Sequence, residues 1–330
     1  TPSPLFSSEP LFTVKLIIQI PCLNEEKTLP LTLKDIPKKI DRVDTIETLV
    51  IDDGSVDRTV EVARERRVDH ILQFTHNKGL AKAFMYGMNR ALELGADIIV
   101  NTDADNQYYG GDIPKLIQPI LDGKADIVVG DRQVETIQHF SPLKILLQKL
   151  GSWIVRQMSG TEIPDATSGF RAYSREAALQ LNVVSDFTYT VETIISAGKK
   201  DLAITHVPVK TNKKLRESRL FPNILTYIQR SIVTMIKIYS MYKPLKVFTL
   251  VGGSSFLLGF GIGCRYLYFF FQDQTAGHVQ SLILSAILLI VGFQIIMMGI
   301  AAELISINRQ LLEDIQLRIK KKEFQKDRSS

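Results

Sequence analysis

The sequence predicts an α/β domain built on a mainly parallel sheet, followed by two helices that cross a membrane. Short apolar runs alternate with amphipathic stretches over residues 14–208, which is the pattern of β-α units. Two longer apolar runs follow, at residues 247–271 and 279–302. Each exceeds the roughly 20 residues that a helix needs to cross about 30 Å of hydrocarbon. Two core helices of a soluble protein are the alternative, but adjacent, nearly uncharged runs of this length favour a membrane hairpin.

The first part of the chain contains strands and helices in alternation. The apolar runs predict strands at residues 15–20, 48–51, 71–74, 97–102 and 126–129. The amphipathic stretches predict helices at residues 28–36, 59–67, 80–94 and 113–121. In sheets of this kind, ligands bind beyond the carboxyl ends of the strands. Three polar segments follow predicted strands, at residues 21–26, 52–57 and 103–105, and we expect them to form a site on one rim of the sheet.

An Asp-x-Asp motif follows the fourth predicted strand. Asp103 and Asp105 straddle its last pleat and the bend after it, and Gln107 comes just behind. Both carboxylates can turn toward one Mg²⁺ or Mn²⁺ that is also held by substrate phosphates. A solvated, Asp-rich turn is the alternative for an isolated motif, but the other two polar segments on the same rim favour a metal site.

Basic residues flank the two apolar runs and predict their orientation. Lys243 and Lys246 precede the first run, whereas the link at residues 272–278 has no Lys or Arg. The basic residues after the second run include Arg309, Arg318, Lys320, Lys321 and Lys322. The positive-inside rule then places both termini on the cytoplasmic side of the cell membrane. Arg265, near the outer end of its span, is expected to extend to the interface.

Positive charge is concentrated beside the membrane. The net charge is +5, and residues 213–246 contain eight Lys and Arg residues against one acid. This distribution is typical of a surface that rests on anionic headgroups, and it favours lipids over nucleic acid as partners. The two cysteines, Cys22 and Cys264, lie in a predicted loop and a predicted span, so we expect no disulfide.

Two further amphipathic segments are predicted to lie in the membrane interface. In the segment 141–158, the apolar residues that cover one face are Leu143, Leu146, Leu147, Leu150, Trp153 and Ile154. The segment 221–245 has a similar apolar face and leads into the first span. For both segments a core helix is the alternative. Small residues in the spans also permit helix association, and therefore a homo-oligomer.

Four motifs in order resemble those of a known enzyme family. They are Pro-x-x-Asn-Glu at 21–25, Asp-Asp-Gly-Ser-x-Asp-x-Thr at 52–59, Asn-x-Gly at 77–79 and Asp-Ala-Asp-x-Gln at 103–107. Together they resemble a family-2 glycosyltransferase domain of the GT-A fold, which is Rossmann-like. With the two terminal spans, the chain is similar to the polyprenyl-phosphate branch, which includes dolichyl-phosphate mannose synthases and bactoprenol glucosyltransferases.

The resemblance implies a donor site for a nucleotide sugar. Pro21, Asn24 and Glu25 would border the nucleoside, and Asp52 or Asp53 would accept a hydrogen bond from the base. Asp57 is also expected to form an Asx-turn before the helix at Thr59. The segment Asp103, Ala104 and Asp105 would bind the diphosphate, with Asp103, Asp105 and Gln107 around the metal. Lys82 either approaches the diphosphate or is a solvated helix residue.

The resemblance also implies residues around the acceptor phosphate and the reaction centre. Arg132, in Gly-Asp-Arg at 130–132, is the first candidate to position the acceptor phosphate, together with Lys149. Asp165 and Arg171, in Asp-Ala-Thr-Ser-Gly-Phe-Arg at 165–171, correspond to family positions at the reaction centre, and with Arg132 they form the predicted catalytic set. Asp165 would hold the metal or the acceptor, or would cap a turn.

A basic loop at residues 213–220 resembles the family's Gly-Glu-Ser-Lys-Leu segment, but Arg216 occupies the glycine position. We expect Arg216, Ser218 and Arg219 to close over the donor diphosphate or the lipid phosphate. The predicted organisation is a disordered N-terminus (1–13), a cytoplasmic catalytic domain (14–220), an interfacial helix (221–245), two transmembrane helices (246–307) and a basic cytoplasmic tail (308–330).

The expected activity is inverting transfer of a hexose to polyprenyl phosphate, of the undecaprenyl type, at the cytoplasmic membrane face. A phosphate monoester is largely dianionic at neutral pH and needs no general base, whereas the leaving diphosphate needs a divalent cation. Glucose and UDP as the donor follow from the resemblance alone. GDP-mannose or an amino-sugar donor is the alternative within this fold, and a catalytically silent membrane scaffold is the alternative from another class.

Overall fold

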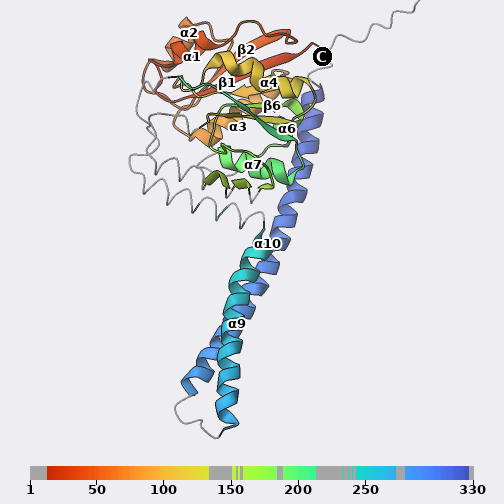
Figure 1. Cartoon of the computed structure of the whole chain (residues 1–330). Coiled ribbons are helices and arrows are strands. Elements are labelled where there is room, and N and C mark those ends of the chain that lie inside the picture. Colours follow the sequence, from red (N-terminus) through yellow and green to blue (C-terminus); the bar gives the residue numbers. More distant parts are fainter. Residues whose placement is uncertain are drawn as a thin grey trace, which may run out of the picture. The chain divides into compact units, whose positions relative to one another are not determined.

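The computed structural model describes residues 13–133, 151–153, 155–156, 159–183, 189–212, 233, 237, 240, 243–272 and 279–326. The chain forms two compact units. The first contains Thr1–Pro222 together with Leu317–Ser330, and the second is Asn223–Gln316 (Figure 1). The first unit is the α/β domain, and the second contains the apolar helices.

The α/β domain has a seven-stranded mixed sheet in the order β3-β2-β1-β4-β6-β5-β7. Its strands are β1 (Lys15–Cys22), β2 (Thr45–Asp52), β3 (His70–Gln73), β4 (Ile98–Asn101), β5 (Ile127–Asp131), β6 (Arg171–Ser174) and β7 (Ile204–Pro208). Only β6 runs antiparallel to its neighbours, β4 and β5. The mainly parallel sheet that the sequence predicts is therefore confirmed, and each predicted strand overlaps an observed one.

Helices cover both faces of the sheet. They are α1 (Leu29–Asp35), α2 (Thr59–Glu65), α3 (Leu80–Glu93), the short 3-10 helix η1 (Gly110–Asp112), α4 (Ile113–Leu121), α6 (Arg175–Gln180) and α7 (Tyr189–Lys199). The four predicted helices correspond to α1, α2, α3 and α4. The sequence analysis did not identify β6, β7, α6 or α7.

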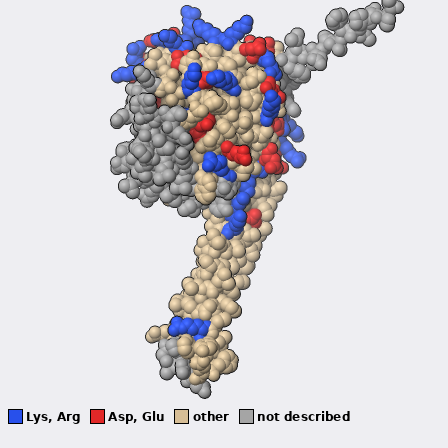
Figure 2. All heavy atoms as spheres, viewed as in Figure 1, with Lys and Arg blue, Asp and Glu red and all other residues tan. Residues whose placement is uncertain are grey.

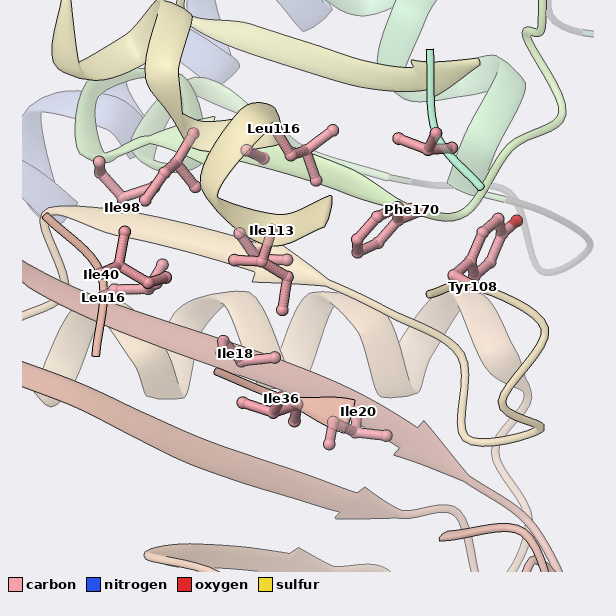
Figure 3. Packing of buried hydrophobic residues seen from close by; sticks show 14 of the residues in the cluster. Leu16, Ile18, Ile20, Ile36, Ile40, Ile98, Tyr108, Ile113, Leu116 and Phe170 are labelled. Atoms are coloured by element: carbon pink, nitrogen blue, oxygen red, sulfur yellow. The ribbon is translucent and has the colours of Figure 1, made fainter. Parts of the chain in front are cut away.

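Alternation along the central strands divides the buried residues into two clusters. Leu16, Ile18 and Ile20 of β1 pack with α1 and α4 on one face, as Figure 3 shows. Ile17 points to the other face, where it joins residues of α3, α6 and α7 such as Phe84. Because both faces of β1 are buried, its sequence is almost continuously apolar, as expected for a central parallel strand.

The second unit contains two helices that are long and apolar enough to cross a membrane. Helix α9 is Pro244–Phe270 and helix α10 is Val279–Lys326, and the predicted spans fall mostly within them. Figure 2 shows a long stretch of this hairpin without a charged side chain on the viewed face. Small residues bring the helices together: a Cβ atom on Gly252 would lie 2.7 Å from the carbonyl oxygen of Gly292, and Ser285 Oγ donates a hydrogen bond to the Gly259 carbonyl at 2.7 Å.

The second helix continues past residue 302 into the segment 308–330, which was predicted as a basic cytoplasmic tail. It is helical as far as Lys326. Its last turns belong to the α/β domain, where Phe324 is buried in the cluster on the α3 face. Arg175 Nη2 donates to the Phe324 carbonyl at 3.3 Å, and Lys320 Nζ donates to Asn89 Oδ1 at 3.0 Å. Lys320, a basic residue of the predicted tail, therefore helps to hold this helix end against the domain.

We predict that replacing Phe324 with Ala lowers the stability of the α/β domain. The loss of a nearly buried phenyl ring should lower the free energy of unfolding by about 3 kcal/mol. The measurement is urea unfolding of the full-length chain in detergent, followed by the fluorescence of Trp153, the single tryptophan, which belongs to this domain. Ile319→Ala is the matched control, because Ile319 lies on the same helix end and is 50% exposed. Equal effects of the two variants would contradict the prediction.

Candidate functional site

Three polar loops meet at one rim of the sheet because they follow adjacent parallel strands. Strand β1 lies between β2 and β4 and is parallel to both. The loops that begin after Cys22, Asp52 and Asn101 therefore leave the sheet at the same edge. This arrangement was predicted from the sequence and is confirmed.

The first two loops are joined through Asn24. The Asn24 backbone N–H donates to Ser55 Oγ at 2.8 Å, and its side-chain Oδ1 accepts from the Val56 N–H at 2.8 Å. Asn24 has a φ of 55°, a left-handed conformation that Asn tolerates better than most residues. Glu25 is buried beside it; its N–H donates to Thr59 Oγ1 at 2.8 Å and its Oε2 accepts from Thr28 Oγ1. Residues predicted to border a nucleoside thus hold two loops together.

The acids of the second loop are also tied to backbone groups. Both oxygens of Asp53 accept hydrogen bonds at the start of α3, from the N–H groups of Lys78 (2.7 Å) and Gly79 (3.0 Å). Asp52 is fully buried and accepts from the Ser55 N–H at 3.2 and 3.3 Å. Asp57 accepts from the Thr59 N–H at 3.0 Å, which confirms the predicted Asx-turn before α2.

The Asp-x-Asp motif is partly exposed at the end of β4. Asp105 Oδ1 accepts from the Gln107 N–H at 3.0 Å, and Asn106 between them has a φ of 56°. This turn leaves Asp105 Oδ2 without a hydrogen bond to the described residues. Ala104 is buried, and its carbonyl accepts from Thr32 Oγ1 at 3.1 Å. Two half-buried carboxylates at the end of a strand can thus face a common ligand.

These residues fit a cation that is shared with a substrate. Among the described residues, no three His, Cys, Asp or Glu side chains converge to enclose a metal ion. Mg²⁺ is commonly held by only one or two carboxylates, with substrate phosphates and water completing its octahedral shell. Asp103 and Asp105 meet that requirement. The backbone of Gln107, by contrast, is engaged with the motif and with Asn212, whose N–H donates to the Gln107 carbonyl at 2.9 Å.

Arg132 and Asp165 form a buried ion pair. Arg132 Nε lies 2.6 Å from Asp165 Oδ2, and Nη2 lies 2.9 Å from Oδ1. Nη2 also donates to Thr167 Oγ1 at 2.8 Å. Burial alone would raise the pKa of Asp165, but the adjacent guanidinium outweighs it and lowers that pKa. The sequence predicted both residues for the site, and the structure brings them together as one charge-neutral unit.

Arg171 is fully buried and shapes the loop that contains Asp165. Its guanidinium donates to the carbonyl oxygens of Ser168, Ala166 and Thr190, at 2.8, 2.8 and 2.7 Å, and to Thr193 Oγ1 at 2.7 Å. These bonds join the loop to the first turns of α7. The side chain has no exposed surface, so in this structure it positions the loop and does not face a ligand.

Several buried polar residues near the motif were not identified from the sequence. Asn101, at the end of β4, donates to the Gly169 carbonyl and to the Tyr189 hydroxyl, both at 2.8 Å. Tyr108 OH accepts from the Gly169 N–H at 2.9 Å, and burial raises the pKa of Tyr108 to about 12. An amide inside an otherwise apolar strand was the available signal for Asn101. Tyr189, far along the chain, had none.

The remaining predicted site residues make none of the contacts described above. Pro21 is buried at the end of β1, and Lys82 is exposed in the first turns of α3. Lys149, Arg216, Ser218 and Arg219 lie outside the described residues, as do most of the proposed interfacial segments 141–158 and 221–245. The described chain reaches Asn212 beside Gln107, immediately before the basic loop.

Two family models match the chain. The Glycosyl transferase family 2 model matches residues 17–181, and the GtrB C-terminal hairpin model matches residues 243–307. The first match contains the three rim loops and the ion pair. The second contains α9 and the first part of α10.

Three known proteins illustrate what this chain is similar to. A UDP-N-acetylglucosamine–dolichyl-phosphate N-acetylglucosaminyltransferase of Methanococcus voltae is 33% identical, over 58% of this chain and 83% of its own. An undecaprenyl-phosphate mannosyltransferase of Micrococcus luteus is 29% identical, over 64% and 90%. Glucosyl-3-phosphoglycerate synthase of Mycobacterium tuberculosis, solved with Mn²⁺, UDP-glucose and phosphoglyceric acid, has a TM-score of 0.54 at 20% identity, over 69% and 80%. At that identity, the likeness concerns the fold.

We predict that Asp165→Asn strongly destabilises the domain, because it leaves the Arg132 charge buried without its partner. The expected loss is about 3–5 kcal/mol in the free energy of unfolding near neutral pH. Because the pKa of Asp165 is lowered in the folded state, its contribution is complete above its unfolded pKa of about 3.9 and is lost as the pH falls through the folded value.

The measurement is urea unfolding of wild type and variant between pH 3 and pH 7. The difference in the free energy of unfolding between the two proteins should become smaller as the pH falls toward 3. Asp122→Asn is the control, because it breaks an exposed pair with Arg42 and should have little effect. The prediction would be contradicted if the free energies of unfolding of wild type and Asp165→Asn differed little at pH 7, or if their difference stayed constant between pH 3 and pH 7.

Proposed function

Because the chain belongs to glycosyl transferase family 2, with the GT-A fold and the GtrB-type hairpin, we propose that it transfers a hexose from a nucleotide sugar to polyprenyl phosphate. The first candidate donor is UDP-glucose, and the reaction inverts the anomeric centre. The observation that carries the proposal is the half-buried Asp103 and Asp105 pair at the sheet rim, in a chain that also has a membrane hairpin.

The donor nucleoside would lie between the first two rim loops. Pro21, Asn24 and Glu25 border it, and the acid pair Asp52 and Asp53 lies at the base. Both acids already accept backbone N–H groups, Asp53 from Lys78 and Gly79 and Asp52 from Ser55, so Asp52 or Asp53 is the proposed acceptor for the base. Because these loops are fixed to each other by hydrogen bonds, the site is preorganised and less ordering is needed when the nucleotide binds.

Asp103 and Asp105 would hold Mg²⁺ or Mn²⁺, with Gln107 beside them. When bound, the cation stabilises the negative charge that develops on the departing diphosphate. The chain's own part is to present carboxylate oxygens, such as Asp105 Oδ2, at the edge of the sheet. Lys82 and the basic-loop residues Arg216, Ser218 and Arg219 are proposed to add donors to the phosphates.

The acceptor phosphate would attack without a general base, since it is already largely dianionic at neutral pH. Arg132 is proposed to position it, together with Lys149. Asp165 and Thr167 engage Nε and Nη2 of Arg132, whereas Nη1 donates to no described residue and is left for a phosphate oxygen. Arg171 supports this arrangement by fixing the loop of Asp165.

The reaction is proposed to take place at the cytoplasmic face of the cell membrane, with both termini on that side. The basic residues at both ends of the hairpin support this orientation. Gly253 and Gly261 of α9 face open space within the described structure, and a homo-oligomer through this helix is part of the proposal.

Two other functions are alternatives to this one, and the experiments below distinguish them. Relatives named for N-acetylglucosamine and mannose transfer favour an amino-sugar or GDP-mannose donor as the second candidate. A catalytically silent membrane scaffold is the alternative from another class. A scaffold would tolerate loss of the rim carboxylates, whereas a transferase would not.

We predict that Asp105→Asn reduces sugar transfer on the order of 100-fold or more, because the cation loses an anionic ligand. The assay is formation of sugar-lipid by purified protein, and urea unfolding should give the same midpoint as wild type. Asp122→Asn, on the exposed surface at the end of α4, is the control and should retain activity. Undiminished transfer by Asp105→Asn would rule out the metal role and favour the scaffold.

We also predict that transfer requires a divalent cation and selects one donor. Purified full-length protein is incubated with undecaprenyl phosphate and UDP-glucose, GDP-mannose or UDP-N-acetylglucosamine, with Mn²⁺, Mg²⁺ or excess chelator. UDP-glucose should give the fastest transfer, and chelator should abolish it. Faster transfer from another donor would correct the sugar, and full activity in chelator would contradict the cation's role.

A further inference from the structure

A chain of buried amide and phenol groups runs through the sheet and ends beside Asp103. Gln19 of β1 donates from Nε2 to Asn101 Oδ1 at 2.9 Å. Asn101 Nδ2 in turn donates to the Tyr189 hydroxyl at 2.8 Å. All three residues are buried. Buried polar groups weaken a core unless they are paired, so a connected chain at this place calls for an explanation beyond packing.

The phenol of Tyr189 is fixed in place from two directions. Its ring stacks on Phe84 with a centroid separation of 4.0 Å and an interplanar angle of 6°. Its oxygen accepts from Asn101, so the hydroxyl proton is directed to another acceptor. Among the described residues, no group accepts that proton. A phenol is protonated at neutral pH, so this hydroxyl has a proton to donate.

Asp103 and this hydroxyl both lie near the position that a side chain at Gly169 would take. A Cβ atom on Gly169 would lie 2.8 Å from Tyr189 OH and 3.1 and 3.2 Å from the two Asp103 oxygens. The phenol and the carboxylate therefore border the same small space, which only a glycine leaves open. Gly169 is itself held by the network, because its carbonyl accepts from Asn101 at 2.8 Å.

We propose that Tyr189 is a positioning residue for Asp103: it supports the carboxylate from behind so that an oxygen faces the cation, and Gly169 keeps the space between them. The inference rests on the proposed function, because it needs a cation at Asp103. Carboxylates that ligate metals are usually hydrogen-bonded by outer residues, and loss of such a residue typically weakens metal binding 10–100-fold.

The test compares Tyr189→Phe with Tyr173→Phe. Tyr173 is equally buried, and its hydroxyl has no hydrogen-bond partner among the described residues, so its removal is a matched control. Mn²⁺ binding to the full-length protein in the presence of UDP is measured from the electron paramagnetic resonance of free Mn²⁺, with no transfer taking place. Tyr189→Phe should weaken Mn²⁺ binding by about 10-fold, and Tyr173→Phe should leave it unchanged.

Gly169→Ala provides a second variant in case Tyr189→Phe does not fold. Its added methyl group would crowd both the Tyr189 hydroxyl and the Asp103 oxygens, so it disturbs the same space by another change and should also weaken Mn²⁺ binding. In transfer assays, both variants should show a raised Mn²⁺ requirement, with the rate at saturating Mn²⁺ reduced less. A purely structural role would lower the unfolding midpoint without changing the Mn²⁺ affinity of the folded protein.

The outcomes separate the two proposals. If wild type binds Mn²⁺ with UDP but Tyr189→Phe binds it equally well, the role of Tyr189 is overturned and the proposed function stands. If Tyr189→Phe does not fold, unchanged Mn²⁺ binding by Gly169→Ala overturns it instead. If wild type neither binds Mn²⁺ with UDP nor transfers sugar, the proposed function itself fails.

Discussion

Two carboxylates at the end of β4 cannot bind a diphosphate by themselves, because like charges repel, and this constraint organises the proposed site. The proposed site therefore requires a cation between Asp103, Asp105 and the diphosphate. The carboxylates of the other two rim loops avoid this repulsion in another way. Asp52, Asp53 and Asp57 accept backbone N–H groups, and Glu25 accepts from the Thr28 hydroxyl, so neutral donors meet these carboxylates. One acidic rim can therefore serve both the uncharged and the charged part of a nucleotide sugar.

The loops that would bind the donor are rigid because the residues that face it also hold the fold. Asn24 joins the first two loops, Asp53 fixes the start of α3, and Arg171 fixes the loop after Asp165 to α7. Such double use makes these positions hard to test by mutation, since a lost contact to substrate and a lost loop geometry have the same effect on activity. Asp105 is the exception. Among the described residues, only one of its oxygens accepts a hydrogen bond, from a local turn, so the two effects can be separated there.

Local patterns in the sequence predicted the sheet, four helices, the hairpin and the rim loops, because each depends on periodicity or on a strand end. They did not predict features that depend on distant residues. Strand β6 begins with Arg171, a residue type that suggests exposure, and is buried only because carbonyls of α7 and of its own loop meet its guanidinium. The packing of the end of α10 against the domain was not predicted, because its lysines and arginines indicated only a basic cytoplasmic tail, although Leu317 and Phe324 share one helix face. The pairing of Arg132 with Asp165 and the place of Tyr189 beside Asp103 also depend on tertiary contacts.

The ion pair of Arg132 and Asp165 resolves a difficulty in the proposed reaction. A phosphate dianion must be held near the sugar, yet a free cation would withdraw charge from the oxygen that attacks. Paired with Asp165, Arg132 belongs to a unit without net charge, and its Nη1, which donates to no described residue, is proposed to act as a directional donor. The pair can therefore orient the acceptor by hydrogen bonds while leaving it nucleophilic. Burial of the pair also helps, because the carboxylate of Asp165 fixes the guanidinium of Arg132. The donor group would then already be oriented before the acceptor lipid binds.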